Sequence, residues 1–110
     1  MTEAEIHRAV IGHIELRGVA GLVYFHVPNA PRSAISGRKL KDMGMRAGVA
    51  DLIMLHQGAA YALELKAENG HLSPQQRQFL ADWQYAGGRA MVTRGLDEAL
   101  GILKKWRLIT

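Results

Sequence analysis

The sequence contains no cysteine, few prolines and no long hydrophobic run. Without cysteine the chain has neither disulfides nor thiolate ligands for zinc, and its five histidines show no close metal-binding spacing such as HxH or HxxxH. Any bound metal is therefore expected to use carboxylates. No apolar stretch reaches the ~18 residues of a membrane-spanning helix, and the beginning TEAEIHRAV is too polar for a secretory signal. We therefore expect a cytoplasmic protein with no membrane partner.

The composition favours one folded domain that covers residues 1–110. Of these residues, 48% are hydrophobic and 22% are charged, as is usual for a globular chain. The net charge of +4 suits a polyanionic partner, although a solvated basic loop is an equal alternative. The excess is concentrated in one segment, in which a single acid accompanies five basic residues: Arg32, Arg38, Lys39, Lys41 and Arg46.

The first segment has the features of a helix that begins after Thr2 and ends near Arg17. Thr2 and Glu5 are spaced as a capping box, in which each side chain binds the backbone amide of the other residue. Glu3 extends the apolar stripe of this helix toward the N-terminus, so we expect it to point along the buried face; an exposed first-turn acid is the alternative. The stripe itself consists of Ile6, Val10 and Ile14.

The rest of the chain alternates between strand and helix patterns. Strands are predicted at residues 22–27, 51–55, 60–66 and 89–94, the last of them parallel to its predecessor. One helix is predicted from the cap Ser73 and first-position Pro74 to the glycines at 87–88, and another from 96 to 106. Segment 29–47 has no obvious structure, which suggests a functional or mobile connection. The predicted fold class is α/β, a mixed β-sheet flanked by helices in the order α-β-β-β-α-β-α.

The stretch GVADLIMLHQGAAYALELK places three charged residues in an otherwise apolar hairpin. If residues 57–58 form a two-residue turn, counting back along both strands places Asp51 opposite Glu64. Their Cβ atoms would be roughly 4.5–5.5 Å apart, with Lys66 on the same face. Directly opposed carboxylates are unfavourable, and either a divalent cation or a structural ion triad with Lys66 would resolve the conflict.

The arrangement of Asp51, a hairpin and then the tripeptide ELK resembles the core of the PD-(D/E)XK nucleases, which have a restriction-endonuclease-like fold. The runs HVPNAPR, GRKLKDMGMRAGVADLIML and ALELKAENGHLSPQQ are similar to the VRR-NUC (virus-type replication-repair nuclease) family in its stand-alone short form. The similarity extends from residue 3 to about 93 and rests on GxxD, ExK and LSPxQ together. The family usually has proline before the motif aspartate; Ala50 in this position removes backbone stiffness but no ligand.

The resemblance implies a Mg²⁺- or Mn²⁺-dependent endonuclease that acts on DNA phosphodiesters. Asp51 and Glu64 would hold the metal with the backbone carbonyl of Leu65, and Glu3 would reach the site from the first helix. Lys66 would orient or deprotonate the attacking water. A metal contributes by polarising the phosphoryl oxygen and lowering the pKa of a bound water.

Several further residues have two interpretations. Gln76 matches a polar residue that similar nucleases place near the water or the phosphate, and it is equally explained as the capping partner of Ser73. His26 and His56 are interpreted as strand and turn residues rather than ligands. Contacts to DNA phosphates, which give affinity without sequence preference, are predicted for Asn29, Arg32, Arg38, Lys39, Lys41 and Arg46. Asn29 is also explained as a turn residue after Pro28.

The resemblance also implies a homodimer that acts on branched DNA such as four-way (Holliday) junctions, because stand-alone family members are associated with this assembly and substrate. One chain has one site and cuts one strand, and a two-fold axis would supply the second site. The alternatives are a nicking or restriction-type nuclease for ordinary duplex DNA, or a non-catalytic DNA-binding module with the same fold. Retention of the acids argues against the module, since binding alone needs none of them.

Overall fold

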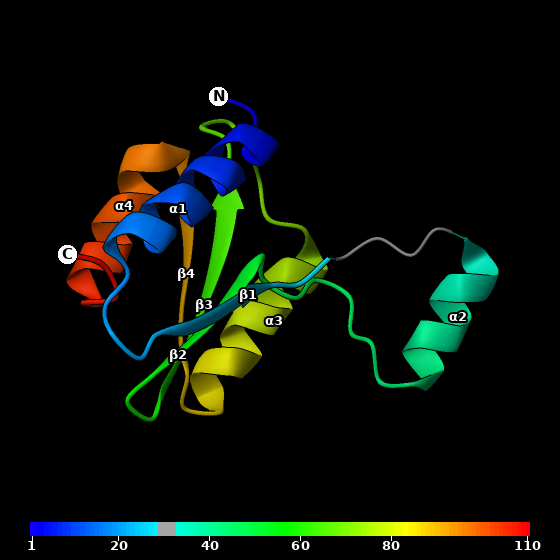
Figure 1. Ribbon diagram of the computed structural model, residues 1–110. Helices are drawn as coiled ribbons and strands as arrows, with labels where there is room; N and C mark the ends of the chain where they lie inside the picture. The colour runs from blue at the N-terminus through cyan, green and yellow to red at the C-terminus, as the bar shows by residue number, and fades with distance from the viewer. Residues whose placement is uncertain (29–32) are drawn as a thin grey trace.

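The structure is built on one mixed four-stranded sheet with strand order β1-β2-β3-β4 (Figure 1). In the computed structural model, residues 1–28 and 33–110 are described. Neighbours β1 and β2, and β2 and β3, are antiparallel, whereas β3 and β4 are parallel. The elements in chain order are α1 (Glu3–Arg17), β1 (Val23–His26), α2 (Ala34–Asp42), β2 (Leu52–His56), β3 (Ala59–Lys66), α3 (Pro74–Tyr85), β4 (Arg89–Arg94) and α4 (Gly95–Lys105).

Helices cover both faces of the sheet (Figure 1). Helices α1 and α4 pack on one face, where the larger core includes Ile6, Val10, Ile14, Met54, Leu63 and Leu103. Helix α3 packs on the other face through Phe79, in a smaller core with Ala50, Ile53, Ala62 and Ala90. The strand residues that belong to the two cores alternate along β2 and β3, because successive side chains of a strand point to opposite faces.

The predicted α/β class is confirmed, and the elements start and end close to their predicted positions. Both capping boxes form, that of Thr2 with Glu5 and that of Ser73 with Gln76, and Pro74 occupies the first helical position as expected. The predicted parallel return of β4 is also observed. Among the described residues, no helix combines the length and apolar character needed to cross a bilayer.

Helix α2 was not predicted, so the observed order is α-β-α-β-β-α-β-α rather than the expected order without it. Ser33 caps this helix by accepting a hydrogen bond from the amide of Ser36 at 3.0 Å. The sequence does not predict this helix, because Gly37 lies inside the segment and the segment has few large apolar residues. In Figure 1, α2 projects away from the sheet, and Ile35 on it is 80% exposed.

Candidate active site

The β2–β3 hairpin has the register that the sequence predicts. Gln57 and Gly58 both have positive φ, at 48° and 81°, as a two-residue type I′ turn requires. The turn makes Leu52 the partner of Leu63. Continuing the register by one residue places Asp51, which directly precedes β2, opposite Glu64 at the far end of the hairpin from the turn.

Asp51 is held by backbone groups of two strands. Its carboxylate Oδ2 accepts a hydrogen bond from the backbone amide of Leu65 at 2.8 Å. Its carbonyl oxygen accepts one from the amide of Val27 at 3.1 Å and lies 2.9 Å from Nδ1 of His26. Because a carbonyl only accepts, that ring nitrogen carries the proton. The contact gives His26 a role in positioning Asp51 that the sequence pattern did not indicate.

Glu64 is buried, and its two carboxylate oxygens have different environments. The exposed fraction of Glu64 is 2% and that of Lys66 is 7%. Oε2 lies 3.5 Å from Nζ of Lys66 and accepts a hydrogen bond from Nε2 of Gln76 at 3.2 Å. Oε1 is buried and has no hydrogen-bond partner among the described residues. The ion pair with Lys66 therefore leaves one oxygen of the carboxylate unsatisfied.

The electrostatic balance at this position disfavours a charged Glu64. Burial is the main cause, followed by the nearby charge of Asp51, and together they raise the pKa of Glu64 from 4.5 to about 8, while Lys66 opposes the shift. A structural ion triad would be expected to leave the carboxylate ionised and fully paired. The carboxyls of Glu64, which is buried, and Asp51, which is half-buried, thus carry more negative charge than Lys66 can neutralise.

Gln76 makes both contacts that the sequence suggests, the capping contact with Ser73 and a contact with the site at Glu64. Its Oε1 accepts from the amide of Ser73 at 2.9 Å, which completes the capping box. Its amide nitrogen donates to Glu64 at the same time. The cap therefore orients the side chain so that the donor faces the carboxylate.

Gly48, the glycine of the GxxD motif, lets the approach to β2 lie directly against the start of α3. Gly48 has a φ of +80°, and a Cβ atom on it would lie 2.4 Å from the carbonyl carbon of Gln75. Only glycine fits this conformation and this contact. The close approach brings the segment that carries Asp51 next to the helix turn that carries Gln76.

Glu3 differs from its predicted position, because its side chain is exposed rather than buried. Glu3 lies three residues before Ile6, which is the first core residue of α1. The carboxylate reaches over the loop after β3, where a Cβ on Gly70 would be 3.2 Å from its Oε2. Glu3 and Asp51 both line a cavity of about 370 Å³, together with His7, Arg8, His26 and Leu65.

The predicted DNA-contacting residues are divided among three environments. Arg38, Lys39 and Lys41 are exposed on α2. Arg46 is also exposed, but it forms a 2.6 Å ion pair with Asp82, and its guanidinium lies 5.4 Å from the ring centre of Phe79, so it links the segment before β2 to α3. Asn29 and Arg32 lie outside the described residues.

The donor set fits a hard divalent cation that keeps part of its water shell. Within residues 1–28 and 33–110, no three His, Asp or Glu side chains are close enough together to hold a metal by themselves. Mg²⁺ commonly needs only one or two carboxylates, with waters and substrate phosphates as its other ligands. Asp51 and Glu64 supply two carboxylates, and the unsatisfied Oε1 of Glu64 is an oxygen that such an ion would satisfy.

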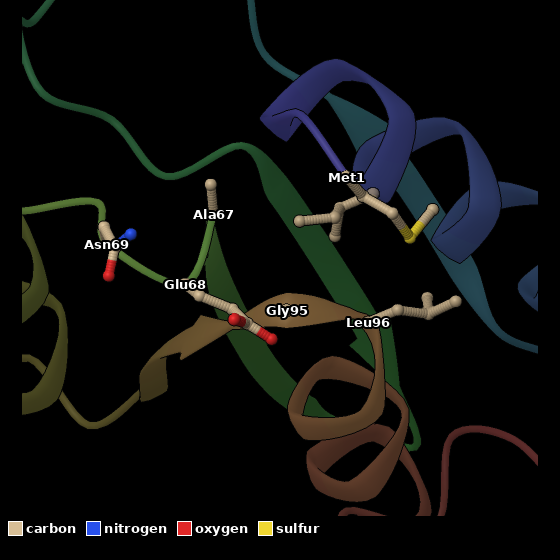
Figure 2. A pocket seen from close by; sticks show the side chains of 7 residues that line it. Met1, Ala67, Glu68, Asn69, Gly95 and Leu96 are labelled. Carbon is tan, nitrogen blue, oxygen red and sulfur yellow. The ribbon is translucent and has the colours of Figure 1, made fainter.

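A second cavity, of about 340 Å³, lies where β3 ends and α4 begins (Figure 2). Met1, Ala67, Asn69 and Leu96 line it, and Glu68 contributes the one charged side chain of the lining. Figure 2 shows this carboxylate beside Gly95. The cavity has no pair of acidic groups, so it lacks the donor set found at Asp51 and Glu64.

The comparisons with known proteins identify the family of the chain. The VRR-NUC domain family matches residues 4–97. The chain therefore belongs to the VRR-NUC domain family, a family of nucleases. No curated protein matches the chain.

Two solved structures have the same fold. One, described as a VRR_NUC domain protein, is 24% identical with a TM-score of 0.81, over 96% of this chain and 88% of that chain. The other, described as a VRR_NUC domain, is 16% identical with a TM-score of 0.67, over 96% of this chain and 99% of that chain.

Proposed function

We propose that the protein is a Mg²⁺- or Mn²⁺-dependent endonuclease that hydrolyses DNA phosphodiesters, with a preference for branched DNA. The observation that carries the proposal is the buried carboxylate of Glu64, with one unsatisfied oxygen, opposite Asp51. A buried and unpaired acidic oxygen beside a second acid destabilises the fold. A bound metal ion would neutralise both acids and take that oxygen as a ligand, so the arrangement favours a metal site. Membership of a nuclease family supports the same reaction.

Each residue of the site would have a distinct task. Asp51, Glu64 and the carbonyl of Leu65 would hold the ion, with Glu3 across the cavity that it shares with Asp51. When bound, the ion would supply a Lewis acid for the phosphate oxygen. Lys66 would orient the attacking water or accept its proton.

Gln76 would keep Glu64 in place through its amide hydrogen bond and lie close to the water. This task does not conflict with its capping contact, because the two contacts use different atoms of the side chain.

DNA affinity would come from the basic face of α2. Arg38, Lys39 and Lys41 are exposed on a helix that projects from the sheet, so they can reach a phosphate backbone without disturbing the core (Figure 1). Contacts of this kind supply affinity that falls with salt and carries no sequence preference. For Asn29 and Arg32, which lie outside the described residues, contact with DNA stays a prediction from the sequence.

The decisive experiment is cleavage of labelled four-way junction, flap and linear duplex DNA with Mg²⁺, Mn²⁺ or EDTA. We expect metal-dependent cutting that is strongest on the junction and that falls at least about 100-fold in Asp51→Asn and Lys66→Ala. Equal cutting of linear duplex would contradict the preference for branches. No metal-dependent cutting of any DNA would contradict the enzyme and favour a non-catalytic DNA-binding module.

Metal binding can be measured without any catalysis. Because the ion would bind only the folded protein, Mg²⁺ or Mn²⁺ should raise the Tm of the DNA-free protein. The increase should be lost in Asp51→Asn. Glu68→Gln, which changes an exposed carboxyl near the end of β3, should retain it.

A further inference from the structure

A histidine of α1 that the proposed mechanism does not use lies beside the candidate active site. His7 is half-buried and lines the cavity of about 370 Å³ together with Glu3 and Asp51. It comes four residues after Glu3, and residues four apart lie on the same face of a helix. One face of α1 therefore brings both a proposed metal ligand and an imidazole to this cavity.

The ring of His7 packs on the ring of His26, the last residue of β1. The two ring centres are 4.5 Å apart and the ring planes meet at 86°, an edge-to-face arrangement that aromatic pairs prefer. On its other side, the ring of His26 donates a hydrogen bond from Nδ1 to the carbonyl oxygen of Asp51. A chain of contacts thus connects α1 with the backbone of Asp51 through two imidazole rings.

This chain of contacts connects two parts of the protein that carry proposed metal ligands. Glu3 belongs to α1, whereas Asp51 directly precedes β2 and is bonded to the end of the edge strand β1. An edge strand has a hydrogen-bonded neighbour on one side only, and the ends of elements open readily unless another contact holds them. His7 supplies such a contact from the helix that carries Glu3.

Packing of the core does not account for the histidine at this position. The core residues of α1 are Ile6, Val10 and Ile14, and His7 lies beside this stripe. An apolar side chain would fill the same space without placing ring nitrogens in a half-buried position. Burial is the main cause that lowers the pKa of His7, so the ring favours its neutral form. A neutral ring suits contact with another ring better than contact with a phosphate.

We propose that His7 is a positioning residue that sets the relative placement of Glu3 and Asp51 through its contact with His26. The inference rests on the proposed metal-dependent function and deepens it at the same site. Residues that orient metal ligands without binding the ion typically change metal affinity or activity about 10–100-fold when they are removed. In this role His7 holds the ligands and binds neither the ion nor the substrate.

Binding of Mn²⁺ to the DNA-free protein, measured by calorimetry, tests the inference without any cleavage. His7→Ala removes the ring that holds His26 and should weaken binding about tenfold. His7→Phe keeps an edge-to-face contact and should bind within about twofold of the unmodified protein. The Tm of each variant in EDTA shows that binding is measured on folded protein.

His13 provides a matched control on the same helix. It is also a half-buried histidine of α1, but its Nδ1 lies 3.1 Å from the guanidinium of Arg17 rather than near the cavity. His13→Ala should therefore change Mn²⁺ binding by no more than about twofold.

A double substitution tests whether His7 acts through His26. The loss caused by His7→Ala should disappear in a His26→Ala background, where the ring pair is already broken. Cleavage gives a second readout, in which His7→Ala should need about tenfold more Mn²⁺ for half-maximal rate while the KM for DNA stays unchanged. Independent, additive losses in the double variant would overturn the proposal.

The outcomes separate this inference from the function on which it rests. If the unmodified protein neither binds Mn²⁺ nor cuts DNA with it, both proposals fail. If it does both and His7→Ala binds Mn²⁺ as well as His13→Ala does, His7 has no positioning role while the proposed function stands. Equal losses in His7→Ala and His7→Phe would also overturn the inference, because a ring nitrogen rather than the ring contact would then be needed.

Discussion

At the scale of single residues, the cost of burying Glu64 is the feature that distinguishes this site. The carboxyl is 2% exposed, and burial next to Asp51 raises its pKa to about 8. An acid with a raised pKa binds its proton more tightly when folded than when unfolded. The folded protein therefore loses stability as the pH rises from about 4.5 to about 8, where the folded state loses the proton.

This predicts a specific pH dependence in the absence of divalent ions. Between pH 5 and pH 8 the Tm of the unmodified protein should fall, whereas Glu64→Gln should be flatter over that range. At pH 8 Glu64→Gln should be more stable by at least about 1 kcal/mol, which corresponds to about 4–8 °C in Tm. Thermal unfolding at a series of pH values checks it, with Glu68→Gln as the control. Parallel curves for the unmodified protein and Glu64→Gln would contradict the assignment.

The two contacts of Gln76 can be separated by two substitutions. Gln76→Glu keeps an acceptor for the Ser73 amide, since glutamate is the usual third residue of a capping box, but it replaces the donor to Glu64 with another carboxylate. Its nuclease activity should fall on the order of tenfold. Ser73→Ala should instead lose about 1 kcal/mol of stability and retain activity per folded molecule. Activity and Tm are measured for both, and the reverse pattern would make Gln76 a cap alone.

At the scale of elements, the contact between the segment before β2 and the start of α3 assembles the site. Gly48→Ala would incur roughly 1–2 kcal/mol of backbone strain and roughly 1–3 kcal/mol from overlap with Gln75. Gly44→Ala is a matched control, because Gly44 also has a positive φ but nothing lies within 4 Å of its Cβ position.

We expect Gly48→Ala to lower both stability and activity, because the overlap separates Asp51 from Gln76. Gly44→Ala should show only the strain, with activity unchanged. Denaturant unfolding and cleavage assays measure the two effects. Equal losses of stability and activity in both variants would show that the close approach of Gly48 has no effect on the site.

At the scale of the whole molecule, exposed apolar residues near the sheet edge are consistent with the homodimer that the family resemblance implies. Val23 and Phe25 on the edge strand β1 are 56% and 48% exposed, and Leu55, the partner of Val23, is 44% exposed. Exposed apolar side chains that adjoin one another are typical of an association surface. A symmetric pair of chains would also place two sites on one junction.

Light scattering at micromolar concentration tests this association. The unmodified protein should have about twice the 12.1 kDa mass of one chain. Phe25→Glu should reduce this mass to that of a monomer, because it places a charge in the apolar patch. Leu16→Glu, at an 87% exposed apolar position on α1, should leave the dimer intact. A monomer before any substitution would contradict the proposal.

Much of the architecture was predictable from the sequence because its signals are local. The Thr2 and Ser73 caps depend on residues three positions apart. The register of the β2–β3 hairpin, which fixes the residues that face each other, follows from a two-residue turn. The opposition of Asp51 and Glu64 follows from that turn, which is why the sequence alone predicts their pairing. Helix α2 was not predicted although its Ser33 cap is local, because Gly37 and the small number of large apolar residues weaken the helical pattern of the segment.

The sequence by itself determined every element except α2, together with the hairpin register and the chemical types at the site, since these depend on short-range spacing. Only the tertiary structure decided that Arg46 pairs with Asp82, that Glu3 is exposed, and that one oxygen of Glu64 has no partner. It also decided the burial of Leu108 and Ile109, which close the larger core near the end of α1. These features depend on contacts between residues far apart in the chain, and no local pattern specifies them.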